Sequence, residues 1–149
     1  MTQSSFAAVM HLLRAHSRIE QRFSGELGAV HGLALKEVLL LMHVEKSPRM
    51  RLSRVDLAKR LSTSPSTVTR MTQPLEKSGL VSRDIDPRDA RLGYVVLTER
   101  GAELVGHARA TLERLSAEMF RDRWTKPEIA SLASLLGRLT TGEPGDLTK

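Results

Sequence analysis

The chain has 149 residues, of which 23 are Lys or Arg and 17 are Asp or Glu, so its formal net charge is +6. It contains no cysteine, which excludes disulfides, thiolate metal sites, a cysteine nucleophile and thiol redox sensing. No apolar run approaches the roughly 20 residues of a membrane span, and aromatic residues make up only 3% of the chain. The composition therefore predicts one basic cytoplasmic domain with no membrane partner and no aromatic platform for single-stranded nucleic acid.

The first two predicted helices are strongly apolar. Residues 4–27 place apolar side chains three or four positions apart, which is the spacing of one helix face. We expect Gly25, Gly28 and Gly32 to interrupt this helix. Residues 34–44 are apolar nearly all round, which predicts a helix buried in the middle of the fold.

Two short helices separated by a tight polar turn follow. Ser53 is the expected N-cap of a helix that ends near Leu61, and Ser64 caps the next one. That fourth helix is predicted to run to Ser78. Pro74 lies inside it and removes one backbone hydrogen bond, so we expect its C-terminal half to bend.

A hairpin and two further helices complete the chain. The runs 80–83 and 94–97 are β-prone and flank the polar segment 84–91, which predicts a hairpin with a long tip. Thr98 is placed to cap a fifth helix, and Thr125 opens a sixth through a capping box.

Helix, turn, helix and charged hairpin in this order predict a winged helix-turn-helix that binds double-stranded DNA. Residues 51–100 hold ten Lys or Arg against six acidic residues, whereas residues 101–149 hold seven of each. One helix fits the major groove of B-DNA, where Arg reads guanine bidentately. The predicted DNA contacts lie on the fourth helix and at the hairpin tip: Ser64, Ser66, Thr67, Arg70, Arg88, Asp89 and Arg91. Arg91 is expected to enter a minor groove, with Asp89 holding its guanidinium.

The segment from Leu57 to Val81 resembles the helix-turn-helix of the MarR (multiple antibiotic resistance regulator) family. Asp89-Ala90-Arg91, followed five residues later by Leu97-Thr98, matches the family's wing signature D-x-R-x5-L-T. The resemblance covers roughly residues 5–140.

This resemblance implies a mainly α fold with a small β-hairpin wing and a helical dimerisation domain. It implies one MarR-type domain over residues 1–149, with a DNA-binding lobe at 33–100 and dimerisation helices at 4–30 and 101–141. It further implies a homodimeric regulator, usually a repressor of a palindromic operator, that is released by a small aromatic carboxylate or phenolic effector and needs no cofactor.

An effector pocket is expected between the dimerisation helices and the DNA-binding lobe. The candidate ligands are His11, Arg14, His16, Arg18 and His43, because an arginine there can pair with a carboxylate effector. The alternative is that these side chains only pack or form salt bridges. The histidines lack metal-ligand spacing, so no metal site is predicted.

Two other classes of function compete with DNA binding. The chain has no nucleophile elbow, phosphate-binding glycine loop or metal triad, so it is not expected to be an enzyme. A winged-helix protein-interaction module without DNA binding is the alternative that remains open, and the basic middle third argues against it.

Overall fold

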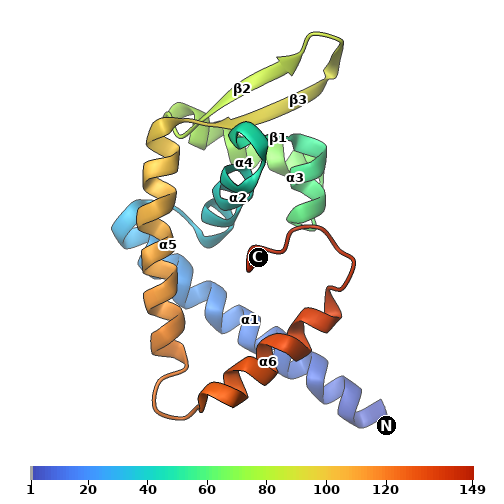
Figure 1. Cartoon of the computed structure of the whole chain (residues 1–149), viewed down its shortest axis with the longest axis vertical. Helices are drawn as coiled ribbons and strands as arrows, with labels where there is room; N and C mark the ends of the chain where they lie inside the picture. Colours follow the sequence, from blue (N-terminus) through green and yellow to red (C-terminus); the bar gives the residue numbers. More distant parts are fainter. Residues whose placement is uncertain (1) are drawn as a thin grey trace.

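The computed structural model describes residues 2–149, apart from the side chains of Thr2 and of residues 90–92. Over these residues the chain is mainly helical, with a small sheet (Figure 1). The elements in chain order are α1 (Thr2–His31), α2 (Leu35–Lys46), the 3-10 turn η1 (Pro48–Met50), β1 (Arg51–Ser53), α3 (Arg54–Arg60), α4 (Pro65–Lys77), β2 (Val81–Asp86), β3 (Asp89–Leu97), α5 (Glu99–Met119) and α6 (Lys126–Leu139).

The three strands form an antiparallel sheet in the order β1-β3-β2. β1 pairs with β3 only from Arg51↔Val96 to Ser53↔Tyr94. β2 and β3 pair further, through Ile85↔Gly93, and the register then shifts between Ile85 and Asp86. Residues 85–93 therefore extend beyond the three-stranded part as a two-stranded projection, which we call the wing arm (Figure 1).

The buried core joins the helices to the sheet. Leu27 of α1, Leu41 of α2, Val68 of α4 and Val105 of α5 are at most 1% exposed, and Val95 of β3 is 2% exposed. Each such side chain contributes about 1.5–3 kcal/mol by leaving water. The prediction of a buried second helix is confirmed, since six of the residues of α2 are buried.

The four N-caps predicted from sequence are confirmed by backbone N–H groups that donate to the capping hydroxyls. These bonds are Asp56 to Ser53 at 3.1 Å, Thr67 to Ser64 at 3.2 Å, Gly101 to Thr98 at 3.0 Å and Glu128 to Thr125 at 3.3 Å. The starts of α3, α4, α5 and α6 are thus set by local sequence.

The expected interruption of the first helix was wrong for Gly25 and Gly28 and correct for Gly32. α1 continues through Gly25 and Gly28 and ends at His31, before Gly32 with φ +71°. A glycine inside a helix costs about 1 kcal/mol relative to alanine, which does not by itself break the helix. Burial of Phe23 and Leu27 against the core offsets that cost.

The prediction of a long polar hairpin tip was also wrong. β2 runs to Asp86 and β3 begins at Asp89, so only Pro87 and Arg88 form the turn. A ladder of backbone hydrogen bonds does not need apolar side chains, which is why the charged residues of the wing arm gave no strand signal. The three-residue strand β1 was missed because it is too short for a periodic pattern.

The C-terminal tail runs from α6 back toward α3 and ends near the middle of the molecule (Figure 1). Gly145, at φ +106°, lies against the backbone of Arg60 in α3, where a Cβ would come within 2.8 Å of the Arg60 carbonyl oxygen. Lys46 Nζ donates to the Asp146 carbonyl at 3.4 Å. The tail thus links the α6 end of the chain to α2 and α3.

Candidate nucleic-acid interface

The turn between α3 and α4 is held by backbone groups. The Thr63 N–H donates to the Ala58 carbonyl at 2.8 Å, and Ser62 adopts φ +53°. α4 then begins with Ser64 as N-cap, and Val68 and Leu75 on its inner side are 0% and 1% exposed. Because these two residues face the core, the opposite side of α4 faces solvent.

That outer side brings together the four residues that the sequence predicted there. Ser64 Oγ lies 3.0 Å from both Ser66 Oγ and Thr67 Oγ1. Arg70 Nη2 donates to Thr67 Oγ1 at 3.3 Å, and the Arg70 side chain is exposed. The first two turns of α4 therefore present clustered hydroxyls and one guanidinium beside a helix N-terminus, an arrangement that suits phosphates and base edges.

The predicted residues of the wing lie at or near its turn. Arg88 is exposed, and its backbone N–H donates to Asp86 Oδ1 at 2.8 Å. Asp89 is half-buried at the start of β3. Arg91 lies in β3, but its side chain is outside the described residues, so its expected pairing with Asp89 stays a prediction.

Ion pairs and a ring contact connect the three-stranded base of the wing to α4 and hold its strands together. Arg83 Nε and Nη2 donate to the two carboxylate oxygens of Glu76 at 2.8 and 3.2 Å, and this hydrogen bonding raises the pKa of Arg83. On the opposite face of the sheet, the Arg51 guanidinium lies 3.6 Å from the centre of the Tyr94 ring and 3.1 Å from Asp84. Both faces of the sheet therefore hold the wing's root in place.

Sequence reasoning missed a further contact between the helix-turn-helix and the wing. Arg54 Nη1 donates to Thr69 Oγ1 of α4 at 3.1 Å, and the same guanidinium lies against Gly93 of β3. The isolated glycine directly before the β-prone run 94–97 was the available signal, since a glycine in a strand often marks a close approach by another group.

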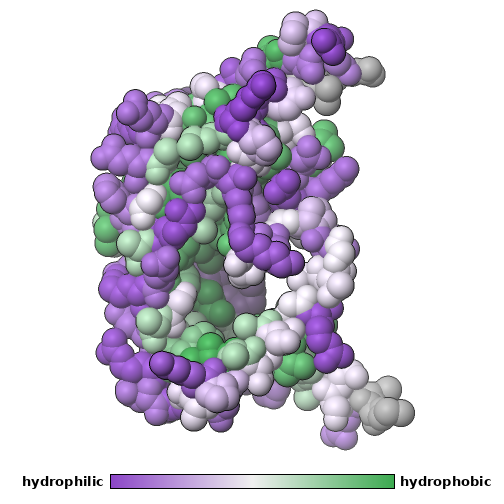
Figure 2. Space-filling view, in the orientation of Figure 1, coloured by the Kyte–Doolittle hydropathy of each residue, from purple (hydrophilic) through white to green (hydrophobic). Residues whose placement is uncertain are grey.

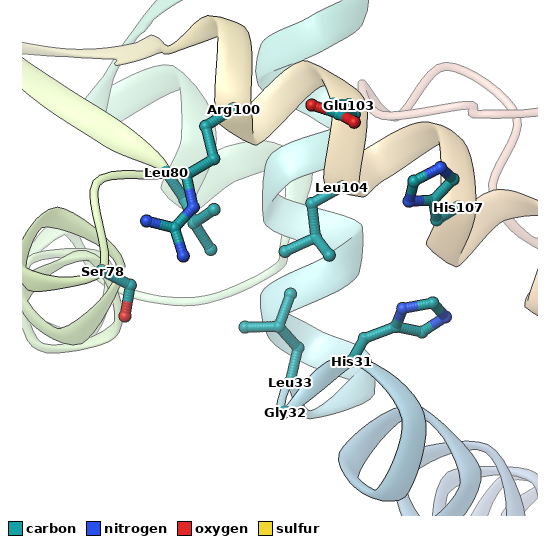
Figure 3. A pocket seen from close by; sticks show the side chains of 9 residues that line it. All are labelled: His31, Gly32, Leu33, Ser78, Leu80, Arg100, Glu103, Leu104 and His107. Carbon is teal, nitrogen blue, oxygen red and sulfur yellow. The ribbon is translucent and has the colours of Figure 1, made fainter.

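A pocket of about 470 Å³ lies between α5, the connection from α1 to α2 and the connection from α4 to β2 (Figure 3). Arg100 extends toward Ser78 and Leu80, while His31 and His107 lie at the other end (Figure 3). The full lining is His31, Gly32, Leu33, Ser78, Leu80, Arg100, Glu103, Leu104 and His107.

None of the five predicted effector ligands lines this pocket. His11, Arg14, His16 and Arg18 are exposed on the N-terminal half of α1. His43 is 3% exposed inside α2, and burial, followed by the charges of Arg60 and Lys46, lowers its pKa to about 4. Their role as effector ligands stays a prediction.

Among the described residues, no group of three or more His, Asp or Glu side chains is placed to hold a metal ion. No single described helix is long and apolar enough to cross a membrane, although α1 from Gln3 onward and α2, bent by 76° at their junction, satisfy length and composition as a pair.

Comparison with known proteins identifies the family. A profile of the MarR family matches residues 33–92, a segment that begins just before α2 and includes most of the wing arm. YhbI of Bacillus subtilis, described as an uncharacterized HTH-type transcriptional regulator, is 32% identical over 108 residues, which are 72% of this chain and 68% of that protein. The chain belongs to the MarR family. It is a transcriptional regulator by family, and YhbI and Sco3205 are likewise described as transcriptional regulators.

Solved structures show the same fold. Sco3205, a MarR family regulator of Streptomyces coelicolor solved in complex with DNA, is 24% identical, with a TM-score of 0.83 over 99% of this chain and 94% of that one. BpsR of Bordetella bronchiseptica, whose DNA binding is regulated by 6-hydroxynicotinic acid, is also 24% identical, with a TM-score of 0.77 over 91% of this chain and 94% of that one. The winged helix-turn-helix fold predicted from sequence is confirmed.

Proposed function

We propose that this MarR-family protein represses transcription by binding a palindromic operator as a homodimer, and that a small aromatic or phenolic effector releases it. The observation that carries the proposal is the outer side of α4, where contacts of 3.0 to 3.3 Å link three hydroxyls and Arg70 into one chain beside the helix N-terminus. Because its operator DNA lies there, the protein would act in the cytoplasm.

Each half of the dimer would bind one half-site. α4 would enter the major groove, with Arg70 reading a base and the hydroxyls of Ser64, Ser66 and Thr67 contacting phosphates or base edges. The wing arm would carry Arg88, Asp89 and Arg91 to the flanking minor groove. The two recognition helices of such a dimer lie roughly 34–36 Å apart, so the half-sites would be about one helical turn apart.

The unpartnered helices at the lower end of the molecule support the homodimer. In α6, all of which the structure describes, no residue is buried in the single chain, and Leu135 and Leu139 are 56% and 69% exposed. In α1, Phe6 and Leu13 are 64% and 56% exposed. Figure 2 shows apolar residues gathered at this end, over α6 and the end of α5.

A helix as short as α6 is marginal in water without tertiary packing. A second copy of the chain would cover the apolar sides of α1 and α6, which belong to the segments 4–30 and 101–141 that we expect to form the dimerisation lobe. Two identical surfaces related by a two-fold axis also match a palindromic DNA site.

The pocket of Figure 3 is the proposed effector site. Its walls come from α5 and the end of α1 on one side, and from Ser78 and Leu80, next to the end of α4, on the other. An occupant that favoured one separation of these walls would move α4 relative to the dimer helices. Arg100 supplies a cation for a carboxylate. His107 and the Nδ1 atom of His31, whose Nε2 bonds Thr111 Oγ1 at 2.8 Å, supply ring nitrogens for a hydroxyl. The regulation of BpsR by an aromatic acid supports this chemistry.

Fluorescence anisotropy tests the DNA binding. The protein is titrated onto DNA from upstream of its own gene and onto shuffled DNA, across a series of salt concentrations. We expect a preference of about 10³-fold or more for the specific fragment, with affinity that falls steeply as salt rises. Absence of binding to any DNA at low salt would refute the proposal and favour a protein-interaction module.

The same assay tests the effector site. We expect 6-hydroxynicotinic acid or benzoic acid to release the DNA, and Arg100→Gln to weaken release by these acids more than release by phenol. Arg121→Gln is the matched control, because Arg121 is exposed and does not line the pocket. Equal responses of the two variants would place the effector elsewhere.

A further inference from the structure

The wing arm begins where the sheet loses its third strand. β1 pairs with β3 as far as Tyr94, and the next residue toward the tip, Gly93, has only Ile85 of β2 as its pairing partner. A two-stranded ribbon with glycine at its root bends more easily than the sheet behind it. Gly93 is therefore the position at which the direction of the wing arm is set.

The Arg54 guanidinium fills the space that this glycine leaves. A Cβ on Gly93 would lie 2.5 Å from Arg54 Nη2, 2.6 Å from Nε and 2.7 Å from Cζ, far inside van der Waals contact. Gly93 is buried and lies in an extended strand, so the space beside its Cα is taken up by the Arg54 guanidinium, and no positive φ is involved. Any side chain at position 93 would displace the guanidinium.

The same guanidinium also holds the recognition helix. Arg54 Nη1 donates to Thr69 Oγ1 at 3.1 Å, and Thr69 Oγ1 in turn donates to the Pro65 carbonyl in the first turn of α4 at 3.1 Å. One planar group thus bridges the root of the wing arm and the DNA-facing half of α4. A lysine ammonium at position 54 could not lie flat against Gly93 and bond Thr69 at once, because it lacks the planar fork.

We propose that Arg54 is a positioning residue that sets the angle between the wing arm and the recognition helix, by bridging Gly93 and Thr69. The consequence for DNA rests on the proposed function. The wing arm reaches about 10 Å beyond Gly93 at strand geometry, so a rotation of about 10° at its root displaces the tip by about 2 Å. A displacement of that size breaks the hydrogen bonds of the tip to DNA while the contacts of α4 persist.

A distance measurement without DNA tests the positioning itself. Because the chain has no cysteine, Arg88→Cys and Gln73→Cys together give one spin label on the tip and one on the exposed side of α4. With labelled protein diluted into unlabelled protein, we expect a narrow distance distribution that broadens or shifts by about 2 Å or more when Arg54→Met is added. An unchanged distribution would overturn the proposal, whatever the protein does with DNA.

Two further variants test the bridge while Arg54 is still present. Thr69→Val removes the acceptor, and Gly93→Ala removes the space, so each should reproduce part of the broadening with Arg54 still present. Gly93→Ala should add nothing further in the Arg54→Met background, because both changes break the same contact. Additive effects would show that Gly93 and Arg54 act separately, against the proposal.

Footprinting on operator DNA tests the consequence. At saturating protein we expect Arg54→Met to lose hydroxyl-radical protection of the flanking minor grooves and to keep the pattern at the two major-groove half-sites, with an overall affinity loss of about 10- to 100-fold. Lys59→Met, which removes one exposed charge from the same helix, should leave the flanking protection intact. Uniform loss of protection in the Arg54 variant would contradict the proposal, because it would show that Arg54 contributes to DNA binding or folding as a whole and not to the wing arm alone. Failure of the unaltered protein to bind any DNA would refute the proposed function alone, since the distance measurement stands without it.

Discussion

His43 makes the stability of the fold depend on pH. It lies inside α2 with 3% of its surface exposed, and burial, followed by the nearby charges of Arg60 and Lys46, lowers its pKa from 6.5 to about 4. The unfolded chain therefore takes up a proton on this imidazole at a higher pH than the folded chain does. Between these two pKa values the unfolded state binds more protons, so the free energy of unfolding falls as the pH falls.

The size of this loss follows from the two pKa values. About one pH unit or more above 6.5, the imidazole is almost wholly neutral in both states and the full stability is present. Lowering the pH from about 7.5 to about 4.5 is expected to remove about 2–3 kcal/mol, and well below pH 4 the loss levels off near 3 kcal/mol. This is a large part of the stability of an ordinary domain.

Urea unfolding at these pH values, at one fixed protein concentration, measures the effect. His43→Leu is the control, because leucine is similar in size to histidine, suits a buried site and cannot titrate. The other histidines and the carboxylates titrate in both proteins, so their contribution cancels. The free energy of unfolding of the unaltered protein minus that of the variant should fall by about 2–3 kcal/mol over this range. Parallel curves would refute the reasoning. So would an NMR titration of the His43 ring with a midpoint near 6.5, which needs no variant.

Three substitutions give further tests. Arg70→Ala should relax base preference at particular operator positions by about 1–3 kcal/mol in binding assays, and an equal loss on every sequence would make Arg70 a phosphate contact. Leu139→Glu, at a side chain 69% exposed in one chain, should dissociate the dimer in analytical ultracentrifugation, and an unchanged dimer would contradict the proposed interface. Gly101→Ala should lower the free energy of unfolding by about 1–3 kcal/mol or more in urea, because its Cβ would overlap the Leu80 carbonyl oxygen. The control Gly106→Ala, where nothing lies within 4 Å, should raise it by about 0.4–1 kcal/mol, and similar losses in both variants would contradict the packing argument.

Local sequence was enough to predict the helix starts and the outer side of the recognition helix. Ser53 and Ser64 cap their helices because a short hydroxyl can satisfy a backbone N–H three residues away in any context. The spacing of Val68 and Leu75 placed the opposite side of α4 toward solvent, where Thr67 and Arg70 now lie. Both are interactions between residues a few positions apart, so they can be predicted from the sequence alone.

The candidate effector pocket could not be predicted in this way. Its lining combines residues near position 31, residues near position 80 and residues from 100 to 107. These segments meet only because α1, α2 and α5 share one buried core, so spacing along the chain carries no sign of them. The predicted ligands on the first helix followed from the family resemblance, and the structure of one chain leaves them exposed.

The class of protein can be read from the chain alone, because the order of helices and hairpin, the caps, the basic middle third and the wing signature all depend on residues close together in the sequence. Three features depend on the folded structure: α1 continues through two glycines, the wing is nearly all strand, and Arg54 occupies the space beside Gly93. Each of these depends on burial or pairing between distant segments. Residues 54 and 93 are far apart in sequence, and the glycine could be understood only once folding had brought the guanidinium beside it.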